Sequence, residues 1–332
     1  MKAAYYTQQG DAKEVLKIGQ LPKIEPKPNQ VRVKVITSGV NPSDLKNRSN
    51  FGGAFPMKYE KVIPHQDGAG IIEAVGENVS KDRIGERVWI FQAQDGKFDG
   101  TSAEFVVVDE KRVAHLPDNI SFEIGASLGI PAMTAHRALF SYGDIKGLNI
   151  LIHGGAGVVG EAAILLAKWA GAYVITTIRK ECDRELAKKA GADVIINMKE
   201  EDTVKIIKEK TDSKGVDLII EVNLKANFKL DLDCIAQGGH IVTYALGKAN
   251  DEVALPVFTS MKKTISFRFV FTYNESEESK QQAVKDIISC LKQGKYHPNI
   301  CLVTSLEDIA KAHIALEERK VPGKILVKIQ EA

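Results

Sequence analysis

Two short stretches of this sequence place residues that could do chemistry close together. Residues 63–70 read IPHQDGAG, where His65 and Asp67 could bind a metal ion together. Residues 154–160 read GGAGVVG, a glycine-rich run that could bind phosphate. Both motifs are common enough that only the elements around them can decide their meaning.

The glycine-rich run has the surroundings that a dinucleotide turn requires. Gly155, Gly157 and Gly160 form a GxGxxG pattern between the apolar run NILIH and the helical pattern VVGEAAILLAKWAGA. In such a turn the first glycine permits a tight bend, the second admits the pyrophosphate, and the third lets the helix pack on its strand. We therefore predict a dinucleotide site, the alternative being an ordinary strand–helix turn.

The end of the next apolar run, YVITTI (173–178), should select the cofactor. NAD sites place an acid there for the ribose 2′-hydroxyl, whereas NADP sites bring a cation close. This chain has Arg179, 24 residues beyond Gly155, and Lys180, with no acid before Glu181. Because arginine can grip a 2′-phosphate with two hydrogen bonds, the pattern predicts NADPH. The alternative is a solvated Arg-Lys pair on a surface loop.

Composition sets the class of protein. The chain has 332 residues, 44% of them hydrophobic, and a formal net charge of +2, which suits two globular domains and favours neither nucleic acid nor a membrane surface as a partner. No signal peptide or membrane-spanning run is expected. The four cysteines lie far apart without a CxxC pair, which is typical of a cytoplasmic protein.

The elements that carry these motifs change character near residue 123. Before it, β-rich runs such as QVRVKVITSGV (30–40), GAGIIEAVG (68–76) and ERVWIF (86–91) predict an antiparallel barrel or sandwich. After it, apolar strands alternate with amphipathic helices, which predicts a doubly wound parallel sheet. Near the end, residues 305–329 predict a helix, with Ser305 as a plausible N-cap, and a last strand.

Four stretches together resemble one family: SGVNPSDLKNRS (38–49), IPHQDGAGIIEAVG (63–76), IPAMTAHRAL (130–139) and LIHGGAGVVG (151–160). They are similar to the zinc-free, zeta-crystallin-type quinone oxidoreductases of the medium-chain dehydrogenase/reductase superfamily. The resemblance implies a GroES-like β-barrel catalytic domain from residues 1–123 and 292–332, and a Rossmann NADPH-binding domain from 124–291. It also implies an active site in the cleft between them.

The same resemblance speaks against zinc. Zinc-dependent members hold the catalytic metal with a cysteine, a histidine and a further cysteine or acid. In this chain Asn41 stands at the cysteine position and Gln66 at the histidine position, while His65 falls one place early, on a glycine. No Cys, Asp or Glu occurs around ASLGIPAM (126–133). Since catalytic zinc needs three protein ligands, the resemblance implies an enzyme without it.

His65 then has two interpretations. It could line the cleft and touch substrate together with Gln66, or it could form hydrogen bonds within a loop, as a lone histidine usually does.

A reductase without zinc needs an acceptor that takes hydride readily, and a quinone does so because the resulting anion is delocalised. By resemblance, Asn41 and Thr134 should lie near the nicotinamide, where Asn41 could polarise a substrate oxygen. Either residue could instead satisfy loop or helix backbone. Lys46 replaces a tyrosine of the family type and could contact an anionic substrate or point to solvent.

The remaining cofactor residues also come from the resemblance. Those expected to line the NADPH site are Ala156, Val158, Val159, Asn223, Tyr244, Ala245, Leu246, Phe269 and Phe271. For Asn223, a surface loop position is the alternative.

The leading hypothesis is a zinc-independent, cytoplasmic NADPH:quinone oxidoreductase, and the resemblance implies a homodimer joined through TISFRFVF (264–271). The alternative enzyme reduces activated C=C bonds of enones or alkenals. A third hypothesis is a protein that binds NADPH without turnover.

Overall fold

The computed structural model describes residues 1–319 and 322–332. The chain forms two compact units: the first unit comprises Met1–Ile130 and Pro298–Ala332, and the second unit comprises Pro131–His297. These boundaries lie slightly beyond the predicted ones at 123 and 291. The first boundary falls within helix α3 (Phe122–Phe140), which is kinked at Gly129.

The first unit is built mainly from β-strands. Its strands are β1 (Lys2–Tyr5), β2 (Lys17–Gln20), β3 (Gln30–Val40), β4 (Asp67–Val75), β5 (Arg87–Ile90), β6 (Phe105–Asp109), β7 (Val113–His115), β14 (Ile300–Ser305) and β15 (Lys324–Lys328). The main sheet has the order β14-β15-β3-β4-β5-β7, with β6 also paired to β3, and β1 and β2 pair separately. The C-terminal strand β15 thus lies antiparallel to β3.

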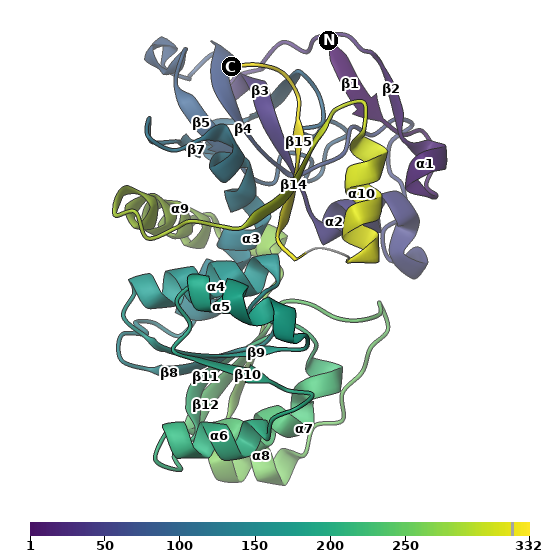
Figure 1. Ribbon diagram of the computed structural model, residues 1–332. Helices are drawn as coiled ribbons and strands as arrows, with labels where there is room; N and C mark the ends of the chain where they lie inside the picture. The colour runs from purple at the N-terminus through teal and green to yellow at the C-terminus, as the bar shows by residue number, and fades with distance from the viewer. Residues whose placement is uncertain (320–321) are drawn as a thin grey trace. The chain divides into compact units, whose positions relative to one another are not determined.

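Short helices complete this unit: α1 (Ala12–Val15), α2 (Pro42–Ser49), α10 (Ile309–Glu318), and the 3₁₀ turns η1 (Asn50–Gly53), η2 (Lys81–Arg83) and η3 (Glu110–Arg112). Helix α10 lies beside β14 and β15 (Figure 1).

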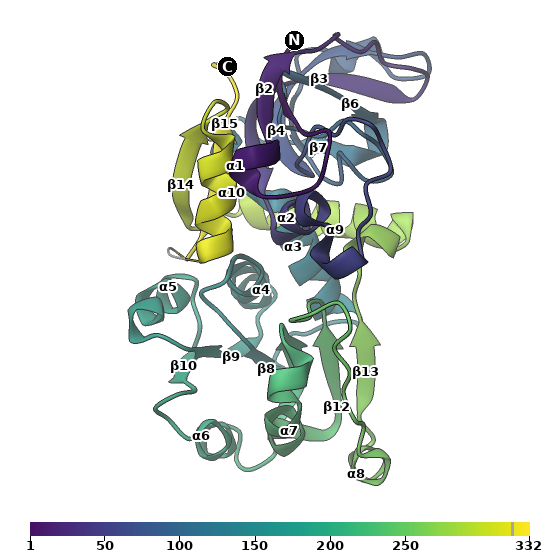
Figure 2. The same ribbon diagram turned by 90° about the vertical axis from the view of Figure 1, so that its right-hand side faces the viewer.

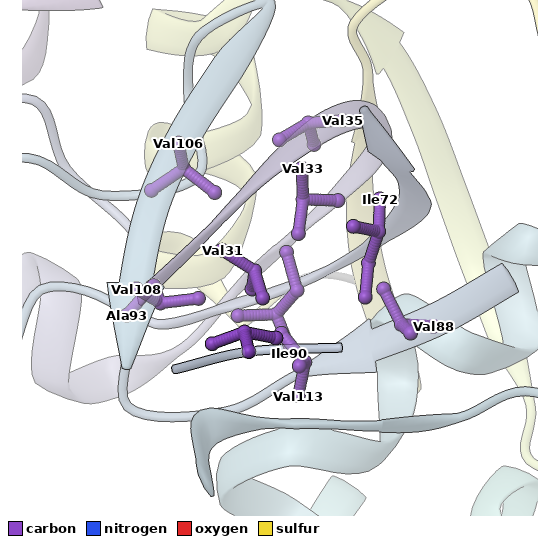
Figure 3. Close-up of a cluster of buried hydrophobic side chains, with 11 residues drawn as sticks. Val31, Val33, Val35, Ile72, Val88, Ile90, Ala93, Val106, Val108 and Val113 are labelled. Atoms are coloured by element: carbon purple, nitrogen blue, oxygen red, sulfur yellow. The ribbon is translucent and has the colours of Figure 1, made fainter. Parts of the chain in front are cut away.

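The core of the first unit follows from alternation along β3. Val31, Val33 and Val35 point into one cluster, where they meet β-branched residues of the neighbouring strands, such as Ile72 and Val106 (Figure 3). Each such side chain stabilises the fold by about 1.5–3 kcal/mol relative to an exposed one. Because successive side chains of a strand point to opposite faces of the sheet, this packing also fixes which side chains of β3 and β4 point away from the cluster.

The second unit is a six-stranded parallel sheet covered by helices on both faces. Its strands are β8 (Asn149–Ile152), β9 (Tyr173–Ile178), β10 (Val194–Asn197), β11 (Val216–Glu221), β12 (Ile235–Thr243) and β13 (Ser266–Phe269). Its other elements are α4 (Val158–Trp169), η4 (Glu181–Asp183), α5 (Arg184–Lys189), α6 (Thr203–Lys210), α7 (Leu224–Cys234), α8 (Val257–Lys263), η5 (Thr272–Asn274) and α9 (Glu277–Lys292). Helices α4 and α5 lie on one face, α6 and α7 on the other (Figure 2).

The strand order β10-β9-β8-β11-β12-β13 confirms the predicted doubly wound sheet. Successive strands are added towards one edge of the sheet from β8 to β10 and towards the other edge from β11 to β13, so the order of addition reverses between β8 and β11. In sheets of this kind ligands bind in the crevice outside the carboxyl ends of the strands at that reversal. The turns after β8 and β11 are therefore the place to look for a site.

One local prediction was wrong. Ser305 is not the N-cap of α10, because it is the last residue of β14 and the helix is preceded by Asp308.

Among residues 1–319 and 322–332, none of the helices combines the length and the apolar character that a membrane-spanning helix needs.

Candidate active site

The glycine turn connects β8 to α4 at the reversal point of the sheet. A Cβ atom at Gly155 would lie 2.2 Å from Thr176 Oγ1, and one at Gly160 would lie 2.2 Å from the carbonyl oxygen of Gly154. Both distances are far shorter than any real contact, so the chain needs glycine at both positions. A Cβ at Gly157, the N-cap of α4, would lie 3.2 Å from the same carbonyl oxygen.

This turn fits a dinucleotide pyrophosphate. Gly157 is exposed, and Ala156, Val158 and Val159 are half-buried around it. The first N–H groups of α4 have no partner within the helix, and the helix dipole favours an anion at this end. The turn therefore offers a close approach to backbone donors, as a phosphate requires.

The end of β9 offers cations and no available acid. Arg179 and Lys180 follow the strand directly and are exposed. Glu181 is occupied, because it forms an ion pair with Arg184 and accepts a hydrogen bond from Asn197 Nδ2 at 3.2 Å. A ribose 2′-hydroxyl would find no free carboxylate here, whereas a 2′-phosphate would meet a guanidinium.

Other predicted cofactor residues lie at the same edge of the sheet. Asn223 is the half-buried N-cap of α7, just after β11. Tyr244, whose N–H donates to the Glu221 carbonyl oxygen at 3.3 Å, follows β12 and leads into half-buried Ala245 and exposed Leu246. The sheet thus brings together the turns after β8, β9, β11 and β12.

Three predicted residues of the second unit lie at or beside the end of β13, whose last residue pairs with Thr243 at the end of β12. Phe269 ends the edge strand β13 and Phe271 follows it, and both are exposed. Thr134 is buried on α3, where its hydroxyl lies 2.6 Å from that of Thr272.

In the first unit Asn41 belongs to a buried polar cluster with Asp44, Asp67 and Lys324. Asn41 Nδ2 donates to Asp67 Oδ2 at 2.7 Å, and Asn41 Oδ1 accepts from Lys324 Nζ at 2.7 Å. Lys324 Nζ also lies 3.3 Å from Asp67 Oδ2. The Asn41 N–H donates to Asp44 Oδ2 at 2.7 Å, which places Asp44 at the start of α2.

The charges of this cluster balance. Burial, and then the Asp67 carboxylate, raise the pKa of Asp44 to about 8, so Asp44 holds a proton at neutral pH. Burial raises the pKa of Asp67 and lowers that of Lys324, while the attraction between the two opposes both shifts. Asp67 and Lys324 form an ion pair, so the cluster carries no net charge.

His65 lies fully buried beside this cluster. Its Nδ1 is 2.7 Å from Ser102 Oγ and 2.9 Å from Ser38 Oγ, and its Nε2 is 2.9 Å from His313 Nε2. The structure therefore corresponds to the second interpretation of His65, hydrogen bonding within its own unit. Its φ of 81° lies in the left-handed region, which glycine adopts easily.

The partners fix the tautomers of the histidine pair. Arg48 Nε donates to His313 Nδ1 at 3.3 Å, so the proton of neutral His313 is on Nε2. His65 Nε2 must then accept, and its Nδ1–H donates to a serine hydroxyl. Burial lowers the pKa of both rings, that of His313 to about 3, so both are neutral.

Asn41 and Gln66, which the resemblance places at zinc-ligand positions, do not fit a dication. Asn41 Oδ1 already accepts from an ammonium group. Gln66 Oε1 accepts from the Gln94 N–H at 3.0 Å. Lys46 lies half-buried on α2, with Nζ 4.5 Å from the ring centre of Phe51.

Sequence reasoning missed Lys324, His313 and Asp44. Only Asp44 left a signal, because it lies three residues after Asn41 and forms a capping box at the start of α2. The other two gain their partners through strand and helix packing near the C-terminus, which no local pattern reveals.

Two family models match the chain, the alcohol dehydrogenase GroES-like domain over residues 27–118 and the zinc-binding dehydrogenase over 158–289. Quinone oxidoreductase from Sus scrofa is 33% identical over 304 residues, covering 91% of this chain and 90% of the relative. The Homo sapiens quinone oxidoreductase is 31% identical, with 87% and 85% covered. The solved structure of Escherichia coli quinone oxidoreductase complexed with NADPH is 25% identical, with a TM-score of 0.85 over 99% of this chain and 100% of that one. The matches confirm the predicted fold class.

We expect Lys324→Met to lower the free energy of unfolding by about 3–5 kcal/mol, because it leaves the Asp67 carboxylate buried without its cation. Adding Asp67→Asn should recover part of the loss. Lys328→Met is the matched control on the same strand, since its exposed pair with Glu331 contributes about 0–1 kcal/mol. Urea denaturation measures all four proteins. Equal losses for Lys324→Met and Lys328→Met would contradict the buried ion pair.

We expect His313→Gln to change how stability depends on pH. The unfolded chain binds a proton on His313 below its ordinary pKa of 6.5, whereas the folded chain does so only near pH 3. The wild type should therefore lose about 1.4 kcal/mol per pH unit relative to the variant as the pH falls from 6.5 towards 4.5. Urea denaturation of both proteins over this range measures the difference. A constant difference would show that the histidine is not held neutral.

Proposed function

Because the chain belongs to the quinone oxidoreductase branch of the medium-chain dehydrogenase/reductase superfamily, we propose that it reduces a quinone with NADPH and without a catalytic zinc ion. The observation that carries the proposal is the glycine turn at Gly155–Gly160, which leads into α4, with Arg179 directly after the adjacent strand β9. An oxidoreductase with this turn draws its reducing equivalents from a dinucleotide.

Three observations support NADPH over NADH. Arg179 and Lys180 are exposed at the end of β9, and the nearest acid, Glu181, is held by Arg184. The related Escherichia coli enzyme was solved with NADPH. An arginine offers a phosphate two parallel hydrogen bonds, so a free guanidinium at this place favours the 2′-phosphate.

The donor set of the first unit supports a reaction without zinc. A catalytic zinc ion takes three protein ligands of the Cys, His or carboxylate type. Asn41 and Gln66 offer only amide oxygens, both hydrogen-bonded, and His65 directs its two nitrogens to Ser102 and His313. A zinc ion at Asn41 would also face the ammonium of Lys324.

The mechanism follows from what these residues can do. NADPH, when bound, supplies a hydride. The backbone N–H groups at the start of α4 and the Arg179 guanidinium would hold its phosphates, and Asn223, Tyr244 and Ala245 lie at the same edge of the sheet. A quinone needs no Lewis acid, because its reduced anion is delocalised and water can protonate it. The chain's task is positioning rather than acid catalysis.

We also propose a homodimer joined along β13. This edge strand and the neighbouring α8 expose large apolar side chains, namely Phe269 at 74%, Phe258 at 73% and Met261 at 69%. A second copy that pairs with the strand edge would cover them.

We expect the purified protein to oxidise NADPH with 1,2-naphthoquinone at an unchanged rate after treatment with EDTA or phenanthroline. A conjugated enone assayed in parallel should turn over much more slowly. NADPH absorbance follows each reaction. Chelator-sensitive oxidation of a simple alcohol would overturn the proposal, and turnover of the enone alone would reassign the acceptor to activated C=C bonds.

We expect Arg179→Ala to raise the dissociation constant of NADPH about 10- to 100-fold, as loss of charge-assisted hydrogen bonds implies. Binding of NADH should change little, because it has no 2′-phosphate. Lys210→Ala is the matched control, since it removes an exposed cation from the C-terminal end of α6, at the opposite edge of the sheet. Calorimetry measures both nucleotides. Equal losses for NADPH and NADH would refute the role of Arg179.

A further inference from the structure

Beneath the glycine turn, three buried titratable side chains that sequence reasoning did not single out lie together in the second unit. His153 follows β8, Glu221 ends β11, and Asp231 lies on α7. All three are within 1% of complete burial, and one ligand-type atom of each lies within 4.8 Å of the others. The proposed mechanism uses none of them.

The three side chains form a continuous hydrogen-bonded path between two cofactor-facing turns. At one end the Gly154 N–H donates to Thr177 Oγ1 at 3.3 Å, and Thr177 Oγ1 lies 3.0 Å from His153 Nδ1. His153 Nε2 is 2.9 Å from Asp231 Oδ1. The path therefore starts in the glycine turn and passes the end of β9.

The path continues to the turn after β11. Glu221 Oε2 lies 3.5 Å from His153 Nε2, and one oxygen each of Asp231 and Glu221 lie within 4.8 Å of each other. Glu221 accepts from the backbone N–H of Asn223 and from Asn227 Nδ2 at 3.0 Å. Two carboxyl groups buried this close together disfavour a second negative charge, so the pair holds one shared proton.

The direction of each hydrogen bond is consistent with that proton. His153 Nε2 donates to Asp231 Oδ1, so Nδ1 of the neutral ring accepts from the Thr177 hydroxyl, which itself accepts from Gly154. Burial lowers the pKa of His153, so the ring is neutral. Burial also raises the pKa of Glu221 and of Asp231 to about 7. The pair therefore loses its shared proton as the pH rises through about 7.

We propose that His153, Glu221 and Asp231 are positioning residues for the cofactor: with their one shared proton they hold the turns at Gly154 and Asn223 in the shape that binds NADPH, and loss of the proton weakens binding. The inference rests on the proposed function, because it takes NADPH as the ligand of these turns.

Loss of the proton acts in two ways. It leaves two neighbouring carboxylates, one on α7 and one at the end of β11, that repel each other. It also adds a buried negative charge close to the turn that binds the phosphates. The new carboxylate repels the phosphates, and the low dielectric of the interior strengthens this repulsion.

The other charged or titratable groups near the path are few among the residues described. Arg179, after β9, lowers the pKa of His153, and Tyr244, after β12, faces Glu221. Cys234 on α7 faces Asp231. Burial raises the pKa of Tyr244 and Cys234 far above neutral, so neither changes its charge between pH 6 and 8.

Glu221→Gln tests the proposal because its amide can donate to Asp231 and accept from Asn223 without titrating. We expect the dissociation constant of NADPH for the wild type to rise about tenfold relative to the variant between pH 6 and pH 8. Ionisation of NADPH itself is common to both proteins and cancels in the ratio. Asp217→Asn, which changes the acid at the amino end of the same strand, should keep the wild-type pH dependence.

Urea denaturation without nucleotide reports the proton independently. Glu221 binds its proton more tightly in the folded chain, so the wild type should lose stability relative to Glu221→Gln as the pH rises from 5 to 7. A constant stability difference would refute the shared proton. A changing stability difference with a constant ratio of NADPH dissociation constants would refute its link to the cofactor turns. Failure of both proteins to bind NADPH at any pH would overturn the proposed function, and this inference with it.

Discussion

The carboxylate of Asp67 is the constraint on which the first unit depends. It joins four segments: Asn41 at the start of α2, Lys324 on β15, the Ile130 N–H on α3, and β4 itself. A Cβ at Gly129 would lie 2.0 Å from Asp67 Oδ1, so the kink of α3 is shaped around the same group. Since Lys324 is 257 positions away, the unit closes only when the C-terminal strand is in place.

This arrangement also bears on the chemistry. A buried carboxylate needs a compensating charge, which in a metal site comes from the ion. Here the ammonium of Lys324 supplies it, and the proton on Asp44 removes a second negative charge. The second unit solves a similar problem with a shared proton between Glu221 and Asp231. The cluster around Asp67 is thus suited to stabilising the first unit. The cluster of His153, Glu221 and Asp231 lies close enough to the glycine turn for a change of its charge to affect cofactor binding.

The sequence predicted those parts of the fold that local patterns determine. Alternating valines gave β3 from residue 30 to 40, and strand–glycine–helix order gave the turn at Gly155. The roles of residues that depend on partners far away in the sequence were not predicted. A lysine in a strand normally faces solvent, and only packing against Asn41 and Asp67 makes Lys324 a buried one. His65 finds its partner His313 at a separation of 248 residues. Ser305 was misread as a helix cap because its pairing with Lys328 on β15 is equally non-local. His153 and Glu221 had a local signal, a polar residue ending each apolar strand.

A crystal structure of the protein with NADPH, with data collected at the zinc absorption edge, is the most direct test of a dinucleotide enzyme that works without zinc. We expect phosphate density on the turn at Gly155–Gly160, the 2′-phosphate within hydrogen-bond distance of Arg179, and no anomalous peak at Asn41 and Gln66. An anomalous peak at those two residues, or a nucleotide bound away from the glycine turn, would contradict it.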